Sequence, residues 1–251
     1  MSEIVLETRH LVRRFGAFLA TNDVSLKVER GARHALIGPN GAGKTTLINL
    51  LTGVLPPSEG QVFLEGEDIT TMASFRRVKR GLTRTFQINQ LFNEFTPLET
   101  VALAIAEREG VGHNLWRSIA GYGKVVDEAA ALLARFGLSS VMGERTVILP
   151  YGKQRLLEIA LAFASKPRVL LLDEPAAGVP EDERHEVLQI VSDLPADVTV
   201  LLIEHDMDLV FRFATRMSVL VNGALFAEGS TDEIARDPRV KAVYLGETSL
   251  A

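Results

Sequence analysis

The chain has 251 residues, of which 47% are hydrophobic and 24% are charged, a composition typical of a soluble globular protein with one large domain or two small ones. Its net charge of -5 and pI near 5.6 lack the basic footprint of most nucleic-acid-binding proteins, so we expect no nucleic-acid partner. The absence of cysteine excludes disulfides, thiolate metal sites and thiol nucleophiles, and it fits a cytosolic protein.

The apolar runs are too short to cross a membrane. The most apolar of them, residues 169–172 and 198–203, fall far short of the roughly 20 residues that a spanning helix needs. Residues 1–9 are polar and acidic, and they lack the basic and then apolar pattern of a signal peptide. If this protein serves a membrane, we expect it to do so from the cytoplasmic side, through protein partners.

The first part of the chain predicts strands around one helix. Residues 4–15 mix β-formers with polar residues and residues 24–28 alternate, so both predict strands of an antiparallel sheet. The short apolar run 35–37 ends in glycine and is followed by helical character over 44–51. Residues 61–64 predict another strand, bounded by glycines.

The middle of the chain predicts helices. Alanine, leucine and charged residues recur at three- and four-residue spacing over 101–108 and 125–136, whereas 110–123 predicts a loop or a broken helical link. The helix expected over 155–165 is amphipathic. Its apolar face carries Leu156, Ile159, Ala160 and Phe163.

The last part predicts central strands and a hairpin. Residues 169–172 and 198–203 are apolar, as expected of strands buried on both faces of a parallel sheet, and a helix is expected over 187–194. The Asn222-Gly223 pair between two apolar runs predicts a tight hairpin. Because strands flank a helix-rich middle, the sequence predicts an α/β core with a helical insertion.

A phosphate-binding loop lies between the strand over 35–37 and the helix over 44–51. It matches the pattern G-x-x-x-x-G-K-[ST] at every fixed position, in the strand-to-helix context that the motif requires. Its glycines let backbone N–H groups converge on phosphate oxygens, and the helix N-terminus adds partial positive charge. We expect Lys44 to reach the β- and γ-phosphates and Thr45 to ligate Mg²⁺. The nucleotide-binding residues are Gly38, Pro39, Asn40, Gly41, Ala42, Gly43, Lys44, Thr45 and Thr46.

Two carboxylates follow the strand over 169–172. A buried strand delivers Asp173 and Glu174 to the C-terminal edge of the sheet, where open α/β sheets bind ligands. Asp173 suits Mg²⁺ binding, and Glu174 is placed to polarise an attacking water. His205 follows the next apolar strand and should emerge at the same edge, where it can donate a hydrogen bond to the γ-phosphate. The alternative is an acidic turn and a histidine without a role.

With these motifs in order, the sequence resembles the ABC ATPase superfamily over its whole length. The resemblance implies a RecA-like P-loop NTPase core, an N-terminal antiparallel β-subdomain and an inserted α-helical subdomain. It also implies roles for Gln87, in Thr85-Phe86-Gln87, as a magnesium ligand and sensor, and for Phe15 as an adenine-stacking residue. The signature motif, which contacts the ATP of a partner subunit, falls on Pro150, Tyr151, Gly152, Lys153 and Gln154.

The finer resemblance is to LivG-type ATPases of branched-chain amino acid importers. It rests on Gly81 to Gln87, on Tyr151 in the signature, on Ala176-Ala177-Gly178 and on the ending from Ala227 to Gly246. This resemblance implies ATP and Mg²⁺ as cofactors and a place on the cytoplasmic face of the inner membrane. It also implies two permease subunits, a second ABC ATPase and, indirectly, a periplasmic substrate-binding protein as partners. Related importers of amides and urea share these features.

The sequence departs from the family pattern at two places. Pro150 replaces the signature serine, whose hydroxyl binds the partner's γ-phosphate together with nearby backbone N–H groups, and proline has neither donor. Gly152 is retained, and Lys153 replaces the usual glutamine. Pro180 stands where many relatives carry aspartate. We therefore expect the composite site that uses this signature to be weakened, unless Lys153 compensates.

Several surface features stay open at this level. A basic cluster before Gln87 predicts a solvated helix face or, alternatively, a contact with headgroups or RNA; it comprises Arg76, Arg77, Lys79, Arg80 and Arg84. Leu91, Phe92 and Phe95 could line a groove for a permease helix or pack in the core.

We expect one ABC ATPase domain over 1–251. Its nucleotide-binding core comprises 1–87 and 166–251, and its helical subdomain comprises 88–165. Two other functions fit the same machinery: a soluble assembly or regulatory ABC protein, or the ATPase of a lipid or polysaccharide exporter. The first usually has tandem domains or long coiled coils, which this chain lacks, and the branched-chain-like residues argue against the second.

Overall fold

The computed structural model describes residues 3–85, 92–111 and 123–245. Contacts between Cα atoms divide the chain into two compact units. The first comprises Met1–Leu82, Arg168–Glu174 and Pro195–Ala251, and the second comprises Thr83–Pro167 and Pro175–Leu194. The limits expected from the sequence, one domain over 1–251 with a core of 1–87 and 166–251 and a helical subdomain of 88–165, remain a prediction.

An antiparallel sheet forms one layer of the first unit. Its strands are β1 (Ile4–Phe15), β2 (Phe18–Val24), β3 (Lys27–Glu29), β5 (Glu59–Leu64) and β6 (Glu67–Asp68), in the order β2-β1-β5-β6 with β3 also paired to β1. The strand expected over 24–28 was wrong, because it spans the break between β2 and β3. At this break the Thr8 hydroxyl donates to Val24 O (2.8 Å) and accepts from the Leu26 N–H (2.9 Å), while the Thr8 N–H donates to Leu26 O (2.8 Å), so a side chain makes part of the pairing.

A second sheet carries the predicted motifs. Its order is β11-β10-β4-β9-β8-β7, and the bounds are β4 (Arg33–Ile37), β7 (Leu82–Arg84), β8 (Val169–Asp173), β9 (Thr199–Ile203), β10 (Arg216–Val221) and β11 (Ala224–Ser230). Strands β4, β8, β9 and β10 are parallel neighbours, whereas β11 returns antiparallel. Every residue of β8 and β9 is buried, as predicted for strands covered on both faces. The hairpin at Asn222-Gly223 is confirmed, and both residues have positive φ.

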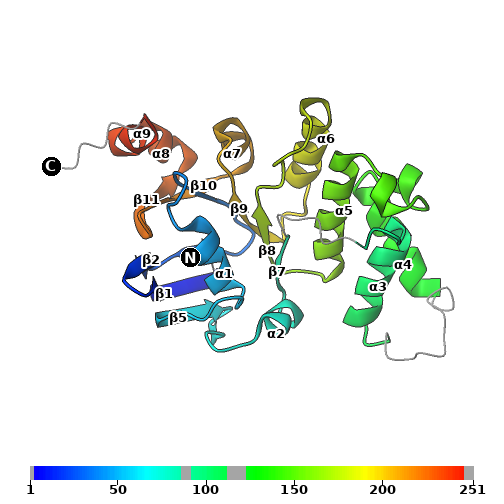
Figure 1. Cartoon of the computed structure of the whole chain (residues 1–251), viewed down its shortest axis with the longest axis horizontal. Coiled ribbons are helices and arrows are strands. Elements are labelled where there is room, and N and C mark those ends of the chain that lie inside the picture. Colours follow the sequence, from blue (N-terminus) through cyan, green and yellow to red (C-terminus); the bar gives the residue numbers. More distant parts are fainter. Residues whose placement is uncertain (1–2, 86–91, 112–122, 246–251) are drawn as a thin grey trace. The chain divides into compact units, whose positions relative to one another are not determined.

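Helix α1 (Lys44–Leu51) is held in the hydrophobic core of the first unit (Figure 1). Its apolar face carries Leu47, Ile48, Leu50 and Leu51, all fully buried. These side chains belong to one cluster with residues of both sheets, among them Leu6 of β1 and Leu171 of β8. The helix that follows the phosphate loop is therefore fixed by contacts with residues of both sheets, and the core extends into the loop at Ala42.

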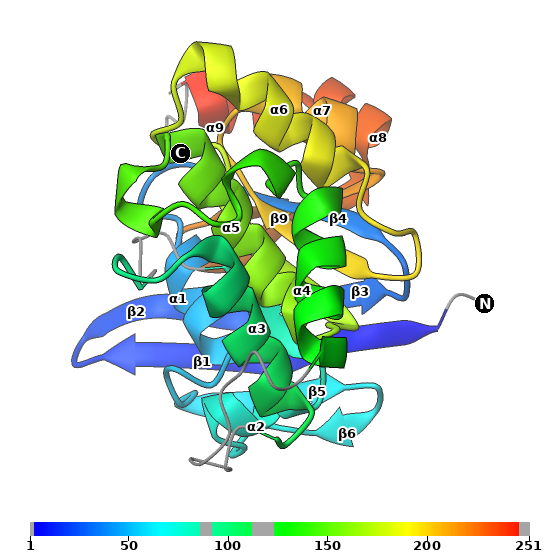
Figure 2. The same cartoon turned by 90° about the vertical axis from the view of Figure 1, so that its right-hand side faces the viewer.

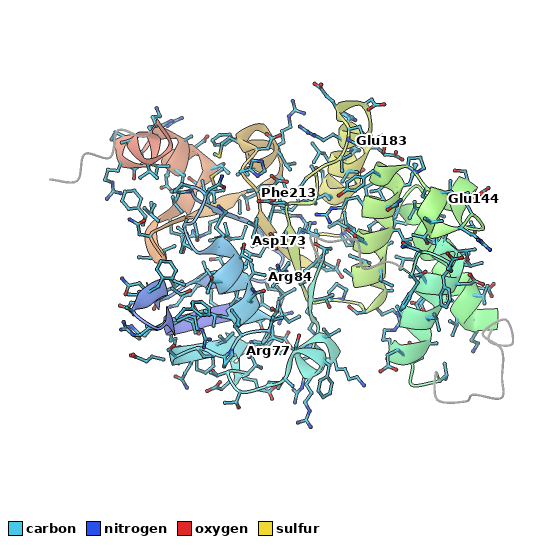
Figure 3. All side chains as sticks on the ribbon, viewed as in Figure 1. Arg77, Arg84, Glu144, Asp173, Glu183 and Phe213 are labelled. Carbon is cyan, nitrogen blue, oxygen red and sulfur yellow. The ribbon has the colours of Figure 1, made fainter. Side chains whose placement is uncertain are left out.

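Arg77 corrects the expectation of a wholly solvated basic cluster. It lies on α2 (Ser74–Lys79) and is 1% exposed (Figure 3). Its guanidinium donates to Leu50 O (2.9 Å) and Leu51 O (2.6 Å), the last carbonyls of α1, and also to Thr70 O and Met72 O. Burial lowers the pKa of Arg77 to about 10. The cation thus caps the negative end of α1, whereas the exposed members of the cluster remain on the surface.

The first unit ends in helices that the sequence reasoning missed: α7 (Met207–Phe213), α8 (Thr231–Arg236) and α9 (Pro238–Leu245). Helix α8 begins with a capping box in which the Ser230 hydroxyl accepts from the Glu233 N–H and the Glu233 side chain accepts from the Ser230 N–H. This Ser-x-x-Glu spacing was a readable start signal.

The second unit contains longer helices, which are α3 (Pro97–Arg108), α4 (Gly123–Arg135), α5 (Tyr151–Ala164) and α6 (Glu181–Ser192), with 3-10 turns at Ser139–Val141 and Thr146–Ile148. Helices α3, α4 and α5 pack side by side (Figure 2). Helix α3 begins four residues before its expected start, because Thr96 and Glu99 form a capping box. Helix α6 begins six residues early, directly after Pro180. Most of the loop expected over 110–123 lies outside the described residues.

His34 is a fully buried titratable group of β4. Its Nε2 lies 2.8 Å from Ser218 Oγ, which donates to Glu228 Oε2 (3.2 Å), while its Nδ1 has no hydrogen-bond partner among the described residues. Burial lowers the pKa of His34 from 6.5 to about 4. The fold therefore requires the neutral imidazole.

The depressed pKa of His34 predicts a pH-dependent free energy of unfolding. The unfolded chain binds a proton at His34 below pH 6.5, whereas the folded chain resists it down to about pH 4. Stability is therefore fully present above pH 6.5 and is lost as the pH falls through this window, by roughly 1.4 kcal/mol between about pH 7.5 and about pH 5.5. Urea unfolding of the wild type, His34→Gln and the exposed-site control His185→Gln checks this. The His34→Gln variant should lose this part of the pH dependence; an unchanged dependence in that variant would contradict the prediction.

Candidate functional site

The register of the parallel strands brings the predicted motifs to one edge of the sheet. Asp173 of β8 lies opposite Ile203 of β9, and Ile203 lies opposite Leu36 of β4. The residues that follow these strands are the phosphate loop, Glu174 and the segment with His205. Three motifs that are far apart in sequence thus leave the sheet at the same level, as expected for the ligand-binding edge of an α/β sheet.

The loop from Gly38 to Gly43 connects β4 to α1. Gly43 stands at the N-cap of α1 with φ 98°, and no side chain caps this helix start within the described part of the chain. A Cβ at Gly43 would lie 2.5 Å from the backbone oxygen of Ala20, so this position excludes every larger residue. The helix start therefore directs backbone N–H groups and partial positive charge toward the loop, an arrangement that suits an anion. Thr45 and Thr46 stand in the first turn, and Thr45 is exposed.

The Lys44 side chain folds back over the loop. Its Nζ donates to Gly38 O (2.6 Å) and Pro39 O (3.1 Å). Burial lowers the pKa of Lys44, and the nearby charges of Glu174 and Asp173 oppose this shift. The ammonium therefore lies in a partly desolvated place between loop carbonyls and two carboxylates, where it can exchange carbonyl oxygens for phosphate oxygens.

Asp173 and Glu174 differ in their surroundings. Asp173 is the last residue of β8 and is 1% exposed (Figure 3). Glu174 has a positive φ of 46°, and its N–H donates to Ile203 O (2.9 Å). A positive φ is rare outside glycine and marks a locally strained backbone that its neighbours hold in place. The end of β8 thus holds the Asp173 carboxylate in a buried position, and the backbone turn at Glu174 directs the next carboxylate toward the surface.

His205 lies beside Glu174, as expected from the sequence. Its Nδ1 lies 3.6 Å from Glu174 Oε1, and its ring is largely exposed. The sequence reasoning missed Glu204, whose side chain is only 2% exposed. The Glu204 carboxylate accepts from the His205 N–H (3.0 Å) and from the Asp206 N–H (3.4 Å). Glu204 therefore shapes the turn that presents His205. Its place directly after an apolar strand was the available signal.

Phe15 lies at the end of β1, in the β1–β2 hairpin. It pairs with Phe18, is 44% exposed and lies under the guanidinium of Arg13, 4.6 Å from its ring centroid. The same hairpin contributes Ala20, the residue that meets Gly43. An exposed ring on the hairpin beside the phosphate loop is compatible with the expected stacking role, which remains a prediction.

The predicted signature residues lie in the second unit, at the start of α5. Pro150 is the exposed N-cap residue, and Tyr151, Gly152, Lys153 and Gln154 form the first turn. Arg155, which sequence reasoning treated only as a helix residue, is 1% exposed and donates to Pro175 O (3.0 Å) and Glu158 Oε2 (2.6 Å). It ties this helix to the segment that follows Glu174 in the sequence.

Gln87 and Leu91 lie outside the described residues, so the expectations for them stand as made. Phe92 and Phe95 are exposed in part, with ring centroids 5.3 Å apart, so they present apolar surface and do not fill a core.

Comparisons with known proteins agree with this geometry. The family model described as "ABC transporter" matches residues 21–177, and one described as "Branched-chain amino acid ATP-binding cassette transporter" matches residues 224–248. The chain is 39% identical to BraF of Pseudomonas aeruginosa, covering 98% of this chain and 100% of that protein. It is 38% identical to LivG of Salmonella typhimurium and 36% identical to LivG of Escherichia coli, with the same coverage. All three are named high-affinity branched-chain amino acid transport ATP-binding proteins.

Solved structures give the same result. A nucleotide-free ATP-binding cassette from an ABC transporter matches with a TM-score of 0.84 and 33% identity, covering 96% of this chain and 98% of that chain. The ADP conformation of an ATP-binding cassette of an ABC transporter matches with a TM-score of 0.83, also at 33% identity, covering 97% of this chain and 99% of that chain. The mixed α/β architecture predicted from the sequence is therefore confirmed.

The steric limit at Gly43 predicts that Gly43→Ala weakens ATP binding at least about tenfold, because the loop must move away from Ala20 to admit a Cβ. The matched control is Gly66→Ala, since Gly66 also has a positive φ (79°) but nothing lies within 4 Å of its Cβ position. Equilibrium ATP binding and thermal unfolding of both variants check this. Equal ATP affinities in the two variants would contradict the assignment of this loop to ATP binding.

Proposed function

The chain belongs to the ABC transporter family of ATP-binding subunits, and on this premise we propose that it powers an importer of branched-chain amino acids or of related amino acids and amides. The observation that carries the proposal is its identity of 36–39% with branched-chain transport ATPases over nearly the whole length of both chains. The match of residues 224–248 to the branched-chain family model supports the same subgroup. As a member of this family, the chain is an ATPase.

The alternative functions are less well supported. A soluble assembly protein or a lipid or polysaccharide exporter would use the same loop and acids, so the site itself does not discriminate. The relatives do discriminate between these functions, because they are named as branched-chain amino acid transport proteins. The C-terminal match lies outside the catalytic motifs and is therefore independent of general ATPase chemistry.

The phosphate loop binds the ATP phosphates in this proposal. Backbone N–H groups at the start of α1 face the anion, and Lys44 leaves Gly38 O and Pro39 O to reach the β- and γ-phosphates. Arg77 at the far end of α1 and the buried apolar face of the helix keep the loop anchored during this exchange.

The residues at this edge fit Mg²⁺. The Thr45 hydroxyl and the Asp173 carboxylate are hard oxygen donors of the type that Mg²⁺ prefers. No three histidine, cysteine or acidic side chains form a metal-binding group within 3–85, 92–111 and 123–245, which agrees with a metal held largely by phosphate and water. Bound Mg²⁺ would neutralise charge on the phosphates, with Thr45, Asp173 and, by resemblance, Gln87 as its protein ligands.

Glu174 and His205 supply the hydrolytic chemistry in this proposal. The fixed backbone of Glu174 directs its half-buried carboxylate toward the edge, where it polarises the water that attacks the γ-phosphate. His205, 3.6 Å from Glu174, donates a hydrogen bond to the γ-phosphate. Phe15 stacks on the adenine.

A second ABC ATPase completes the site in this proposal. The signature of the partner covers the nucleotide held by Lys44, and the signature at the start of α5 covers the partner's nucleotide. Since Pro150 offers neither a hydroxyl nor an N–H, the site that uses this chain's signature is the weaker of the two. One lost hydrogen bond to a charged group costs about 1.5–3 kcal/mol, so impairment is expected and not complete loss.

The membrane partners are two permease subunits, supplied with substrate by a periplasmic binding protein. Within the described residues, no helix is long and apolar enough to span a bilayer. Attachment to the cytoplasmic face of the inner membrane therefore depends on the permeases. The exposed Phe92 and Phe95 are candidates for this contact.

Replacing Glu174 by Gln should leave ATP affinity within about threefold of the wild type and lower turnover at least about 100-fold, because the amide cannot polarise the attacking water. Single-turnover hydrolysis and ATP binding by the reconstituted transporter measure the two effects. Glu59→Gln, an exposed acid on β5, is the control. Normal turnover in the Glu174 variant would refute the assigned role.

Replacing Pro150 by Ser should raise the ATPase rate of the reconstituted transporter about three- to tenfold, because it restores a hydroxyl and an N–H donor at the signature. Pro238→Ser, at the first residue of α9, is the control for a proline lost from another helix start. An unchanged rate in Pro150→Ser would show that the proline does not limit this site.

Purification from native membranes tests the proposed function. Two integral membrane permeases and a second ATPase should co-purify with this chain, and proteoliposomes of the complex should take up a branched-chain amino acid on addition of ATP and the binding protein. Recovery as a free soluble complex without permeases would reject the transport function.

A further inference from the structure

Helix α5 begins without a cap of its own. Pro150 is its N-cap residue, and no side chain of the described residues caps the helix from that position. The proline ring has no acceptor, so the N–H groups of the first turn depend on acceptors from elsewhere.

Glu183 supplies one such acceptor. The Gly152 N–H donates to Glu183 Oε2 at 2.6 Å, a short distance typical of a hydrogen bond to a charged carboxylate. Gly152 is buried, whereas Glu183 is half-buried. Glu183 lies in the first turn of α6, which packs against α5 (Figure 3).

A second acid of α6 holds the next residue of α5. Lys153 Nζ lies 2.7 Å from Glu186 Oε1 and also donates to Gly137 O (3.1 Å). Glu183 and Glu186 are three residues apart, so they lie on one face of α6. Two carboxylates of one helix face thus contact two consecutive residues of the predicted signature.

The close contact between Gly152 and the Glu183 carboxylate requires glycine at position 152. A Cβ there would lie 2.4 Å from Glu183 Oε2 and 3.0 Å from Glu183 Cβ. Any side chain at 152 would therefore displace Glu183, so the close approach depends on glycine.

We infer that Glu183 occupies the place of the partner's γ-phosphate on the Gly152 N–H and must be displaced when ATP closes the two ATPases. This inference rests on the proposed function, in which the signature N–H groups face that phosphate. One N–H cannot donate fully to two anions, and a carboxylate and a phosphate at the same donor repel each other. Glu183 thus raises the ATP concentration that closure requires.

Displacement of Glu183 is structurally simple. Its side chain is half-buried and is no part of the hydrophobic core, so it can rotate toward solvent without opening that core. The Lys153–Glu186 ion pair can keep α5 and α6 together while Glu183 is displaced. The carboxylate therefore acts as a removable cap of α5, not as a fixed part of the site.

The contact itself can be measured on the full chain alone. In ¹⁵N-resolved NMR spectra, the hydrogen bond to the carboxylate should shift the Gly152 amide proton downfield in the wild type, and Glu183→Ala should remove this shift. Glu181→Gln changes an exposed acid in the same turn of α6 and should leave the Gly152 resonance in place. An unchanged Gly152 resonance in Glu183→Ala would show that the hydrogen bond does not form, and it would overturn the inference.

The role of the contact is measured in the reconstituted transporter. Glu183→Gln removes the repelling charge, and it should lower the KM for ATP about three- to tenfold while kcat stays within about twofold. Glu183→Ala should do the same, and Glu181→Gln should not. A purely structural role would instead lower the thermal unfolding temperature and kcat without lowering KM.

The outcomes separate this inference from the proposed function. If the wild-type complex hydrolyses ATP and transports its substrate but the Glu183 variants keep the wild-type KM, the displaceable cap is wrong and the proposed function stands. If no permease complex forms at all, the proposed function fails, and with it the role of Glu183 toward a partner, even where the NMR contact is found.

Discussion

The parallel register of β4, β8 and β9 is the constraint on which the rest depends. Because Asp173, Ile203 and Leu36 lie at one level, the residues that leave these strands meet at a single edge. The buried face of α1 and the Arg77 cap fix the phosphate loop at that edge, and the positive φ of Glu174 turns its carboxylate away from the strand. The position of the site is therefore set by the geometry of the sheet.

Much of this arrangement follows from the sequence, since motif spacing and apolar runs report directly on strands and on the turns after them. Strands β8 and β9, the loop before α1 and the Asn222-Gly223 hairpin were predicted for this reason. The break between β2 and β3 was not, because the Thr8 hydroxyl makes part of the pairing there, and a backbone pattern does not report a side-chain contact of this kind. The burial of Arg77 was missed because a charged pattern on a helix does not reveal which member meets the carbonyls of another element. The contact between Glu183 and Gly152 was missed for the same reason, since the two residues are 31 positions apart in the sequence.

Two hydrogen-bond donors among the predicted nucleotide-binding residues, the Lys44 ammonium and the Gly152 N–H, have acceptors within the chain. Lys44 rests on loop carbonyls between two carboxylates, and the Gly152 N–H rests on Glu183. In the proposed function, nucleotide binding replaces both of these partners by phosphate: Lys44 turns to the chain's own ATP, and the Gly152 N–H turns to the ATP of the second ATPase. In the proposed function, Pro150 removes two hydrogen-bond donors from the signature that faces the partner, and in the further inference Glu183 competes for the Gly152 N–H. The asymmetry between the two ATP sites remains a prediction, to which the proposed role of Glu183 adds a second cause.

The most direct test of the account is calorimetric titration of the purified chain with Mg-ATP, in the wild type and in Lys44→Ala. The account predicts one ATP per chain and an affinity at least about tenfold lower in the variant, because Lys44 is the loop's only side-chain cation for the phosphates. Wild-type affinity in Lys44→Ala would place the nucleotide elsewhere and contradict the assignment of the sheet edge.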